Sequence, residues 1–209
     1  GFKVSILTRK LISAPKLTQS FELINSLDNT NQSYDVIINL AGEPLNKRRW
    51  NDNVKQQIYD SRINITKQVI NFIEHAQIKP KLLISGSAIG YYGEDLHKIF
   101  TEDTSPAESG FTHKLCHDWE QIASQATQSG VRVCLIRTGI VLDKNAGALK
   151  ELLIPFKFGL GSILGNGKQW MSWIHIDDLV SAIIFLINNQ ELSGPFNLTA
   201  PSPVTNQEF

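Results

Sequence analysis

Three polar residues, Thr8-Arg9-Lys10, follow a short apolar stretch at positions 4–7 and have side chains suited to binding a phosphate group. A guanidinium can pair with two phosphate oxygens at once, and a lysine ammonium adds a compact positive charge. No acidic residue lies among the three. The alternative interpretation is a solvated basic loop after a strand, and the segment taken alone leaves both open.

Two histidines, His113 and His117, lie four positions apart with Cys116 between them. Histidines at this helical spacing can ligate zinc. No glutamate follows the first histidine and no third ligand is evident. We therefore interpret the pair as part of an exposed helix face and expect no metal site.

The elements that would position such residues alternate along the chain as strand, helix and strand. Nearly continuous apolar segments predict strands buried on both faces, at residues 4–7, 35–40, 82–84 and 131–136, with a short further strand at 196–198. Apolar residues at helical spacing predict helices at about residues 54–73, 115–126 and 177–187. His175, Asp177 and Asp178 are expected to cap and pack the start of the last helix. The alternation indicates an α/β fold with a doubly wound parallel sheet.

Doubly wound sheets of the Rossmann type bind dinucleotides, and the end of their second strand lies at the adenosine ribose. An acid there accepts a hydrogen bond from the 2′-hydroxyl, whereas an arginine pairs with a 2′-phosphate. Thr8 and Arg9 therefore favour NADP(H) over NAD(H). The sequence contains no G-x-G-x-x-G motif. Because those glycines precede the second strand by about 20 residues, we expect the first strand and its Gly-rich turn to lie ahead of Gly1.

Several later segments resemble the extended branch of the short-chain dehydrogenase/reductase superfamily, namely residues 35–42, 84–93, 137–141 and 173–179. Shorter motifs resemble an epimerase-like, atypical family often labelled a cell-division inhibitor homologue, within the NAD-dependent epimerase/dehydratase superfamily. These motifs are Ala41-Gly42-Glu43-Pro44-Leu45, Arg48-Arg49-Trp50, Ser61-Arg62, Trp119-Glu120 and Asn197-Leu198-Thr199-Ala200-Pro201. The resemblance covers essentially the whole chain. It implies an NAD(P)-binding Rossmann-type domain, truncated at both ends, with part of a small substrate-binding lobe.

The same resemblance implies a set of cofactor contacts. Thr8 and Arg9 would take the 2′-phosphate end, and Leu40 and Ala41 would pass under the adenine ribose and the pyrophosphate. The remaining expected contacts are Gln57 and Arg62, which project toward the same groove, and Ser85, Gly86 and Val141 at the nicotinamide side.

The catalytic residues depart from the pattern of the superfamily, in which a Ser or Thr, a Tyr and a Lys assist hydride transfer. Ser87 fits the Ser position. The Tyr is expected near position 111, where the chain has Phe111, and the Lys four residues later, where it has Leu115. Tyr91 or Tyr92 would have to substitute; the alternative is that these two tyrosines pack against the nicotinamide pocket or the lid.

Two functions follow from these residues. The first is an NADP(H)-dependent oxidoreductase or epimerase-like enzyme that acts on an unidentified small molecule, with Ser87 and Tyr91 as its catalytic groups. The second is a non-catalytic module that senses NADP(H) and passes on a conformational signal. Loss of the Tyr and Lys favours the second, whereas the Ser87 turn and the lid favour the first.

The charge composition of the chain argues against some classes of binding partner. Lys+Arg and Asp+Glu both number 20, so the formal net charge is zero, which argues against nucleic acid or an anionic membrane as the main partner. The longest apolar runs are too short to span a bilayer, and no signal peptide opens the chain. We therefore expect a cytoplasmic protein; a homodimer remains open.

The expected domains follow the same pattern. Residues 1–146 would form the Rossmann-type domain. Residues 147–168, rich in glycine, lack the Lys-Ser/Thr ending of a P-loop and would form a lid or an excursion toward the substrate lobe. Residues 169–195 would return to the Rossmann-type domain, and residues 196–209 would begin the C-terminal substrate lobe.

Overall fold

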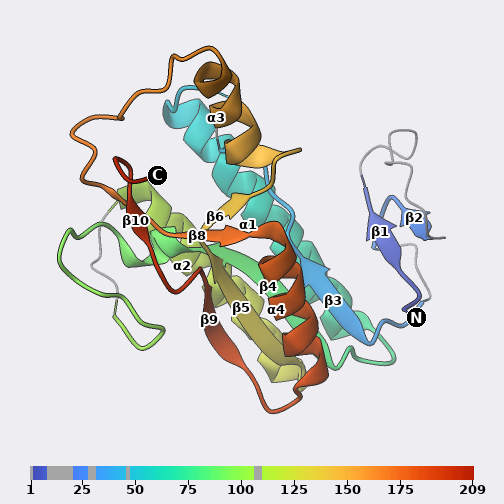
Figure 1. Ribbon diagram of the computed structural model, residues 1–209. Helices are drawn as coiled ribbons and strands as arrows, with labels where there is room; N and C mark the ends of the chain where they lie inside the picture. The colour runs from blue at the N-terminus through green and yellow to red at the C-terminus, as the bar shows by residue number, and fades with distance from the viewer. Residues whose placement is uncertain (1, 9–20, 28–31, 46–47, 106–109) are drawn as a thin grey trace.

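The computed structural model describes residues 2–8, 21–27, 32–45, 48–105 and 110–209. Its main sheet has four parallel strands in the order β3-β4-β5-β9 (Figure 1). The strands are β3 (Val36–Asn39), β4 (Leu82–Ala88), β5 (Arg132–Thr138) and β9 (Gly194–Leu198). The register places Asn39 beside Ser85, and Ser87 beside Arg137. Because the strands are parallel, their carboxyl ends meet at one edge of the sheet.

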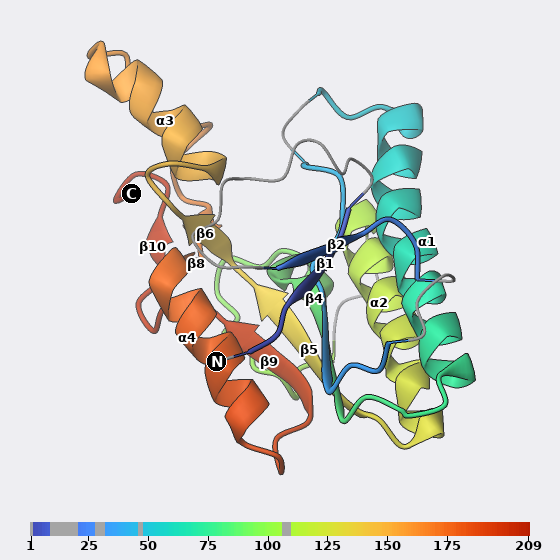
Figure 2. The ribbon, with the colours of Figure 1, turned by 90° about the vertical axis from the view of Figure 1, so that its right-hand side faces the viewer.

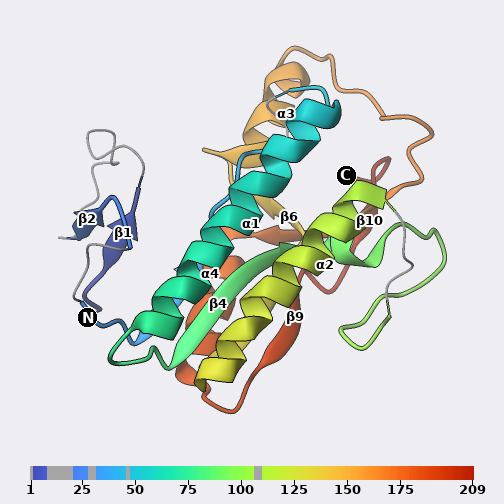
Figure 3. The ribbon, with the colours of Figure 1, turned by 180° about the vertical axis from the view of Figure 1, so that it is seen from behind.

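Helices cover both faces of this sheet. The first face carries α1 (Asp52–His75) and α2 (Gly110–Ser124), and the other carries α4 (Ile176–Asn188), as Figures 2 and 3 show. Two short 3₁₀ helices, η2 (Ile89–Tyr92) and η3 (Gln125–Ser129), follow β4 and α2. The arrangement confirms the predicted doubly wound α/β fold.

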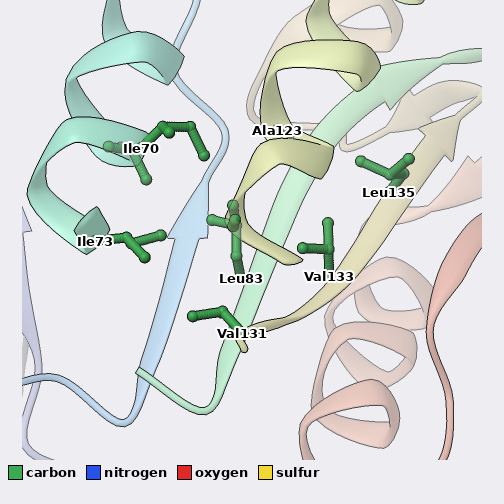
Figure 4. Packing of buried hydrophobic residues seen from close by; sticks show 9 residues of the cluster. Ile70, Ile73, Leu83, Ala123, Val131, Val133 and Leu135 are labelled. Atoms are coloured by element: carbon green, nitrogen blue, oxygen red, sulfur yellow. The ribbon is translucent and has the colours of Figure 1, made fainter. Parts of the chain in front are cut away.

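Two hydrophobic clusters hold the layers together because successive strand residues point to opposite faces. Leu83, Val133 and Leu135 pack beneath α1 and α2, as Figure 4 shows, with Ile73 of α1 fully buried among them. The intervening strand residues pack against α4 in the second cluster; they are Leu82, Ile84, Cys134 and Ile136. Burial on both faces explains why the strand sequences are almost continuously apolar.

Polar side chains cap the N-termini of two helices that cover the main sheet. The N-cap of α1 is Asn51, whose side chain accepts a hydrogen bond from the Val54 amide at 2.9 Å. The N-cap of α4 is His175, whose Nδ1 accepts from the Asp177 amide at 3.2 Å. Asp177 and Asp178 lie in the first turn, where an acidic residue suits the helix dipole. The predicted capping role of His175 is thus confirmed.

A second, two-stranded parallel sheet lies apart from the first. It pairs β1 (Ser5–Leu7) with β2 (Glu22–Ile24) and has no strand in common with the main sheet (Figure 1). The strand predicted at residues 4–7 is confirmed as β1. The three-residue β2 was not predicted, since a strand so short carries no periodic signal.

The remaining elements cluster near the carboxyl end of the sheet. They are β6 (Ile140–Leu142), α3 (Gly147–Lys157), β7 (Trp170–Met171), β8 (Trp173–His175) and β10 (Val204–Thr205). The helix α3 has no buried residue, so it projects from the layers of the domain (Figure 2). The main sheet extends to Leu198, three residues past the expected boundary at 195. Within the described part of the chain, no helix has both the length and the apolar character needed to cross a membrane.

Candidate active site

A large open cavity runs along the full length of β3 and separates the β1–β2 sheet from β3, α1 and α4. Its volume is about 2590 Å³. Four of the expected cofactor contacts line it: Thr8 at the end of β1, Leu40 and Ala41 after β3, and Gln57 on α1. Arg9, the residue expected at a 2′-phosphate, lies outside the described residues. The cavity is therefore shared by Thr8 and by Leu40 and Ala41, which follow it in the sequence by more than 30 positions.

The turn after β3 is held against α1 by side-chain hydrogen bonds. Asn39 donates to Thr66 Oγ1 at 2.9 Å and accepts from the Ala41 amide at 3.3 Å. Ser61 Oγ accepts from the Glu43 amide at 3.0 Å. These bonds leave the turn exposed, and Leu40 keeps 56% of its surface accessible. The backbone of the turn is thus fixed in place while it faces open space.

Arg62 reaches from α1 over this turn. Its Nη2 donates to the Glu43 carbonyl and its Nη1 to the Ile58 carbonyl, both at 3.1 Å. Its guanidinium carbon lies 5.5 Å from the ring centre of Trp119, a cation–π distance. A Cβ at Gly42 would lie 2.7 Å from Arg62 Cζ, so glycine there lets the guanidinium cross the turn. Burial lowers the pKa of Arg62, yet an arginine remains cationic at neutral pH.

The three contacts expected at the nicotinamide side lie deeper. Ser85 is fully buried, and its hydroxyl faces the carbonyl of Gly86 at 3.4 Å. A Cβ at Gly86 would lie 2.9 Å from Trp119 Cη2, so this glycine allows α2 to approach β4 closely. Val141 packs against the hydrophobic cluster beneath α4. A ligand at this edge would therefore meet backbone atoms of these residues more readily than their side chains.

Ser87 belongs to a buried polar network. Its hydroxyl donates to Glu120 Oε1 at 2.6 Å, and only 7% of the residue is exposed. Glu120 also accepts two hydrogen bonds from Arg137, from Nε at 2.9 Å and from Nη2 at 2.8 Å. Arg137 Nη1 donates to Tyr92 Oη at 2.9 Å, and Tyr92 Oη donates to Asn197 Oδ1 at 2.6 Å. We call these five residues the Arg137 network.

Electrostatics favour the charged form of the arginine in this network. Burial by itself lowers the pKa of Arg137, but the hydrogen bonds with Glu120 and Tyr92 and the charge of Glu120 outweigh it, and the pKa rises above its ordinary value. The two side chains of the ion pair are 4% and 7% exposed. A buried pair of this kind contributes most when its remaining polar atoms are hydrogen-bonded, as they are here.

The two adjacent tyrosines occupy different environments. Tyr92 is 3% exposed and its hydroxyl is bonded within the Arg137 network. Tyr91 is half-buried, and its ring centre lies 3.5 Å from the guanidinium carbon of Arg137. The Tyr91 hydroxyl has no hydrogen bond to any residue in the described ranges. Of the two candidates, Tyr91 therefore keeps an available phenol and Tyr92 does not.

The start of α2 carries the positions expected for the usual Tyr and Lys. Phe111 packs edge-on against Trp50, with ring centres 5.6 Å apart, and Leu115 is 5% exposed. Thr112 and Cys116 approach the turn after β4 at Gly90, where a Cβ would lie 3.1 Å from Thr112 Cβ and 3.8 Å from Cys116 Sγ. Like His113, which bonds to the Tyr91 carbonyl, they carry neither a phenol nor an ammonium.

His113 departs from its interpretation as part of an exposed helix face, which was wrong for this residue. It is 8% exposed, and its Nδ1 donates to the Tyr91 carbonyl at 2.6 Å. Helix packing against η2 buries this side of α2, while His117 remains exposed on the next turn. No group of three or more His, Cys, Asp or Glu residues suited to a metal occurs within the described ranges.

Sequence reasoning assigned no role to four residues that the structure places at this site: His113, Glu120, Arg137 and Asn197. Three of them stand inside the motifs that carry the family resemblance, at residues 119–120, 137–141 and 197–201. Their position inside these motifs was the one feature of the sequence that indicated a role at the site. The spacing of the residues could not predict that Arg137 lies beside Ser87 and Asn197, because this depends on the register of the strands.

The sequence of this chain is similar to those of curated epimerase family proteins. Curated relatives include epimerase family proteins from Staphylococcus aureus (strain N315), 45% identical over 172 residues, and from Mycobacterium leprae (strain TN), 45% identical over 175 residues. The matches cover 82% and 84% of this chain but 57% and 56% of the relatives. The chain thus spans little more than half the length of these relatives.

Solved structures of epimerase proteins are also similar to this chain. The human epimerase family protein SDR39U1 (isoform 2), crystallised with NADPH, superposes with a TM-score of 0.87 at 31% identity, over 99% of this chain and 68% of that protein. A nucleoside-diphosphate sugar epimerase from Corynebacterium glutamicum gives 0.79 at 34% identity, over 97% and 42%. The model of the NAD dependent epimerase/dehydratase family matches residues 16–198. The resemblance seen in the sequence motifs is thereby confirmed, and the chain belongs to the NAD dependent epimerase/dehydratase family.

Proposed function

We propose that this chain forms the NADP(H)-binding part of an epimerase-like oxidoreductase that transfers hydride to or from an unidentified small molecule. The observation that carries the proposal is the part of the cavity at the carboxyl end of β3, where Leu40 and Ala41 share the lining with Thr8 and Gln57. Ligands of doubly wound sheets bind outside the carboxyl ends of the strands. The related human protein was crystallised with NADPH, and its structure superposes on 99% of this chain. This similarity supports the same cofactor here.

The residues at this cavity fit a dinucleotide. The turn at residues 40–43 has small residues at Ala41 and Gly42, so a flat ligand can approach its backbone. Thr8 and Gln57 supply polar groups along the walls, and Arg62 brings a positive charge to the turn. Arg9 would take the 2′-phosphate, and this preference for NADP(H) derives from the sequence.

Bound NADP(H) would supply the hydride donor or acceptor. Tyr91 would exchange a proton between its phenol and the reacting oxygen of the substrate. Ser87 lies near the end of β4, four residues before Tyr91, and its hydroxyl already donates its proton to Glu120. Its oxygen retains the capacity to accept a hydrogen bond. We further propose that residues 147–168, which include the unburied helix α3, cover the substrate during the reaction.

The second candidate is a module that senses NADP(H) without turnover. The engagement of Ser87 with Glu120 at 2.6 Å specifically favours it, because this hydroxyl has no proton left to donate to a substrate. Phe111 and Leu115 add to that argument because they lack the phenol and the ammonium of the usual Tyr and Lys. The two candidates share the cofactor and differ only in whether hydride is transferred to or from a substrate.

The experiment that tests the cofactor is a calorimetric titration of the full-length protein with NADPH and with NADH. We expect NADPH to bind more tightly and Arg9→Asp to abolish that preference, by about 1.5–3 kcal/mol for a charge-assisted contact. Lys67→Asp is the matched control, since it makes the same charge change at an exposed position of α1 that does not line the cavity. If neither nucleotide binds the wild-type protein, both candidates are contradicted.

A further inference from the structure

The guanidinium of Arg137 is bonded along its edges by residues from several elements. The carboxylate of Glu120, on α2, accepts hydrogen bonds from Nε and Nη2, and the hydroxyl of Tyr92, on η2, accepts one from Nη1. The Glu102 carbonyl, from the loop after η2, accepts a longer bond from Nη1 at 3.3 Å. A guanidinium donates its hydrogen bonds within its own plane. The plane of Arg137 is therefore fixed, and only its two flat faces remain for other contacts.

Tyr91 occupies one of these faces. The Arg137 guanidinium carbon lies 3.5 Å from the centre of the Tyr91 ring, much closer than the 5.0 Å to the ring of Tyr92. The Tyr92 ring stands almost perpendicular to that of Tyr91, at 87° and 5.5 Å. A cation over a ring face attracts the ring, and the attraction is largest where water is excluded, as it is around the 3%-exposed Arg137.

The backbone of Tyr91 is held independently. His113 Nδ1 donates to its carbonyl at 2.6 Å from the buried side of α2, with the two ring centres 5.8 Å apart. Ring and backbone of Tyr91 are thus both fixed, while its hydroxyl makes no hydrogen bond inside the described part of the chain. A side chain held so completely, with only its reactive atom free, has the character of a positioned catalytic group.

We propose that Arg137 is a positioning residue for Tyr91, presenting the flat face of an edge-bonded guanidinium that holds the phenol at the carboxyl edge of the sheet. This inference rests on the proposed function, in which Tyr91 exchanges the proton. Arg137 touches neither substrate nor cofactor in this account. It acts through Tyr91, and its own position depends on Glu120 and Tyr92.

The test is a double-mutant cycle on the full-length protein, with NADPH as the hydride donor and 9,10-phenanthrenequinone as the carbonyl probe. Arg137→Lys keeps the charge but cannot bond along three edges and stack at once. We expect it to lower kcat by about tenfold and to change the NADPH dissociation constant by less than about twofold. In a Tyr91→Phe background the same substitution should have no further effect on kcat, because the two residues act as one unit.

Two further variants separate positioning from folding. Tyr92→Phe removes one edge bond and leaves the Arg137 side chain intact; it should lower kcat by about threefold, again only when Tyr91 is present. Lys79→Arg is the matched control, since Lys79 lies beyond the C-terminus of α1, donates to the carbonyls of Ile73 and Glu74 and does not line the cavity. It should leave kcat unchanged. The ring resonances of Tyr91 in ¹³C-labelled tyrosine, assigned with Tyr91→Phe, should shift in Arg137→Lys and Tyr92→Phe but not in Lys79→Arg.

The outcomes distinguish the two claims. Tyr91-dependent losses in kcat together with shifted Tyr91 resonances support the positioning role. If the wild-type protein reduces the quinone but the losses are equal with and without Tyr91, or the Tyr91 resonances do not move, the positioning role is overturned and the proposed function stands. If the wild-type protein binds NADPH but transfers no hydride to the quinone, the proposed oxidoreductase function fails, and the inference fails with it.

Discussion

The carboxyl ends of neighbouring strands differ in how they meet solvent. At the end of β3, Leu40 is 56% exposed and the turn at residues 40–43 faces an open cavity. At the ends of β4 and β5, Ser87 and Arg137 are 7% and 3% exposed, and their polar atoms are bonded within the Arg137 network. One edge of a single sheet thus contains an open region and a closed one.

This difference separates binding from positioning. A ligand needs accessible backbone and room, which small residues after β3 provide. A group that must hold one orientation needs neighbours that cannot rearrange, which the bonded side chains after β4 and β5 provide. Tyr91 belongs to the closed region through its ring, while its hydroxyl makes no hydrogen bond to any of the described residues.

The largest expected effect comes from opening the closed side. Arg137→Met should lower the free energy of unfolding by about 3–5 kcal/mol, because it leaves the buried Glu120 carboxylate without its cation. Urea denaturation measures this change. Adding Glu120→Leu should recover most of the loss, since two apolar side chains leave no buried charge. A double variant no more stable than Arg137→Met would contradict the account of the pair.

A smaller effect should appear at alkaline pH. Burial raises the pKa of the Cys116 thiol from its ordinary value of 9.0 to about 11. Between pH 9 and pH 11 the unfolded chain therefore loses this proton while the folded chain keeps it. The free energy of unfolding should fall as pH rises through this window, by up to about 1.4 kcal/mol per unit from this group.

The comparison that isolates the thiol is Cys116→Ala. Urea denaturation at pH 9 and at pH 11 should show a shallower pH dependence in this variant than in the wild type, with equal slopes at pH 6 to 8, where the thiol is neutral in both states. Identical losses between pH 9 and pH 11 would show that Cys116 ionises as freely in the folded protein as in the unfolded chain.

The smallest effect is expected at the start of α2. Phe111→Tyr should change the rate of quinone reduction by NADPH by less than about twofold, because the ring packs against Trp50 and not against the turn after β4. Stopped-flow absorbance of NADPH measures the rate. A rise of tenfold or more would place position 111 at the reacting oxygen and would restore the usual geometry of the superfamily.

The main sheet could be predicted from the sequence because its strands are apolar on both faces. Residues such as Leu82, Leu83 and Ile84 leave no polar position at which a surface strand could face water. The short strands β2, β6, β7 and β10 have two or three residues each, too few to show a period of two. Their formation depends on partners distant in the chain.

The candidate site divides in the same way. Thr8, Leu40 and Ala41 could be predicted because each follows a recognisable strand, and strand ends meet at one edge of a parallel sheet. The pairing of Glu120 with Arg137 could not, since it joins a helix to a strand across 17 positions and depends on how α2 packs. The prediction that His113 lies on an exposed helix face was wrong for the same reason. His113 is buried because α2 packs against η2, an element that the sequence did not predict.

The central claim is that the open end of β3 binds the cofactor, and Ala41→Leu tests it most directly. This substitution adds bulk at an exposed position of the cavity wall and should leave the fold intact. Calorimetric titration of the full-length variant with NADPH should show affinity weakened at least tenfold, about 1.4 kcal/mol. Gln77→Leu, at an exposed position beyond the C-terminus of α1, should bind NADPH like the wild type. If Ala41→Leu also binds NADPH like the wild type, the cofactor does not lie at the end of β3 and the account is contradicted.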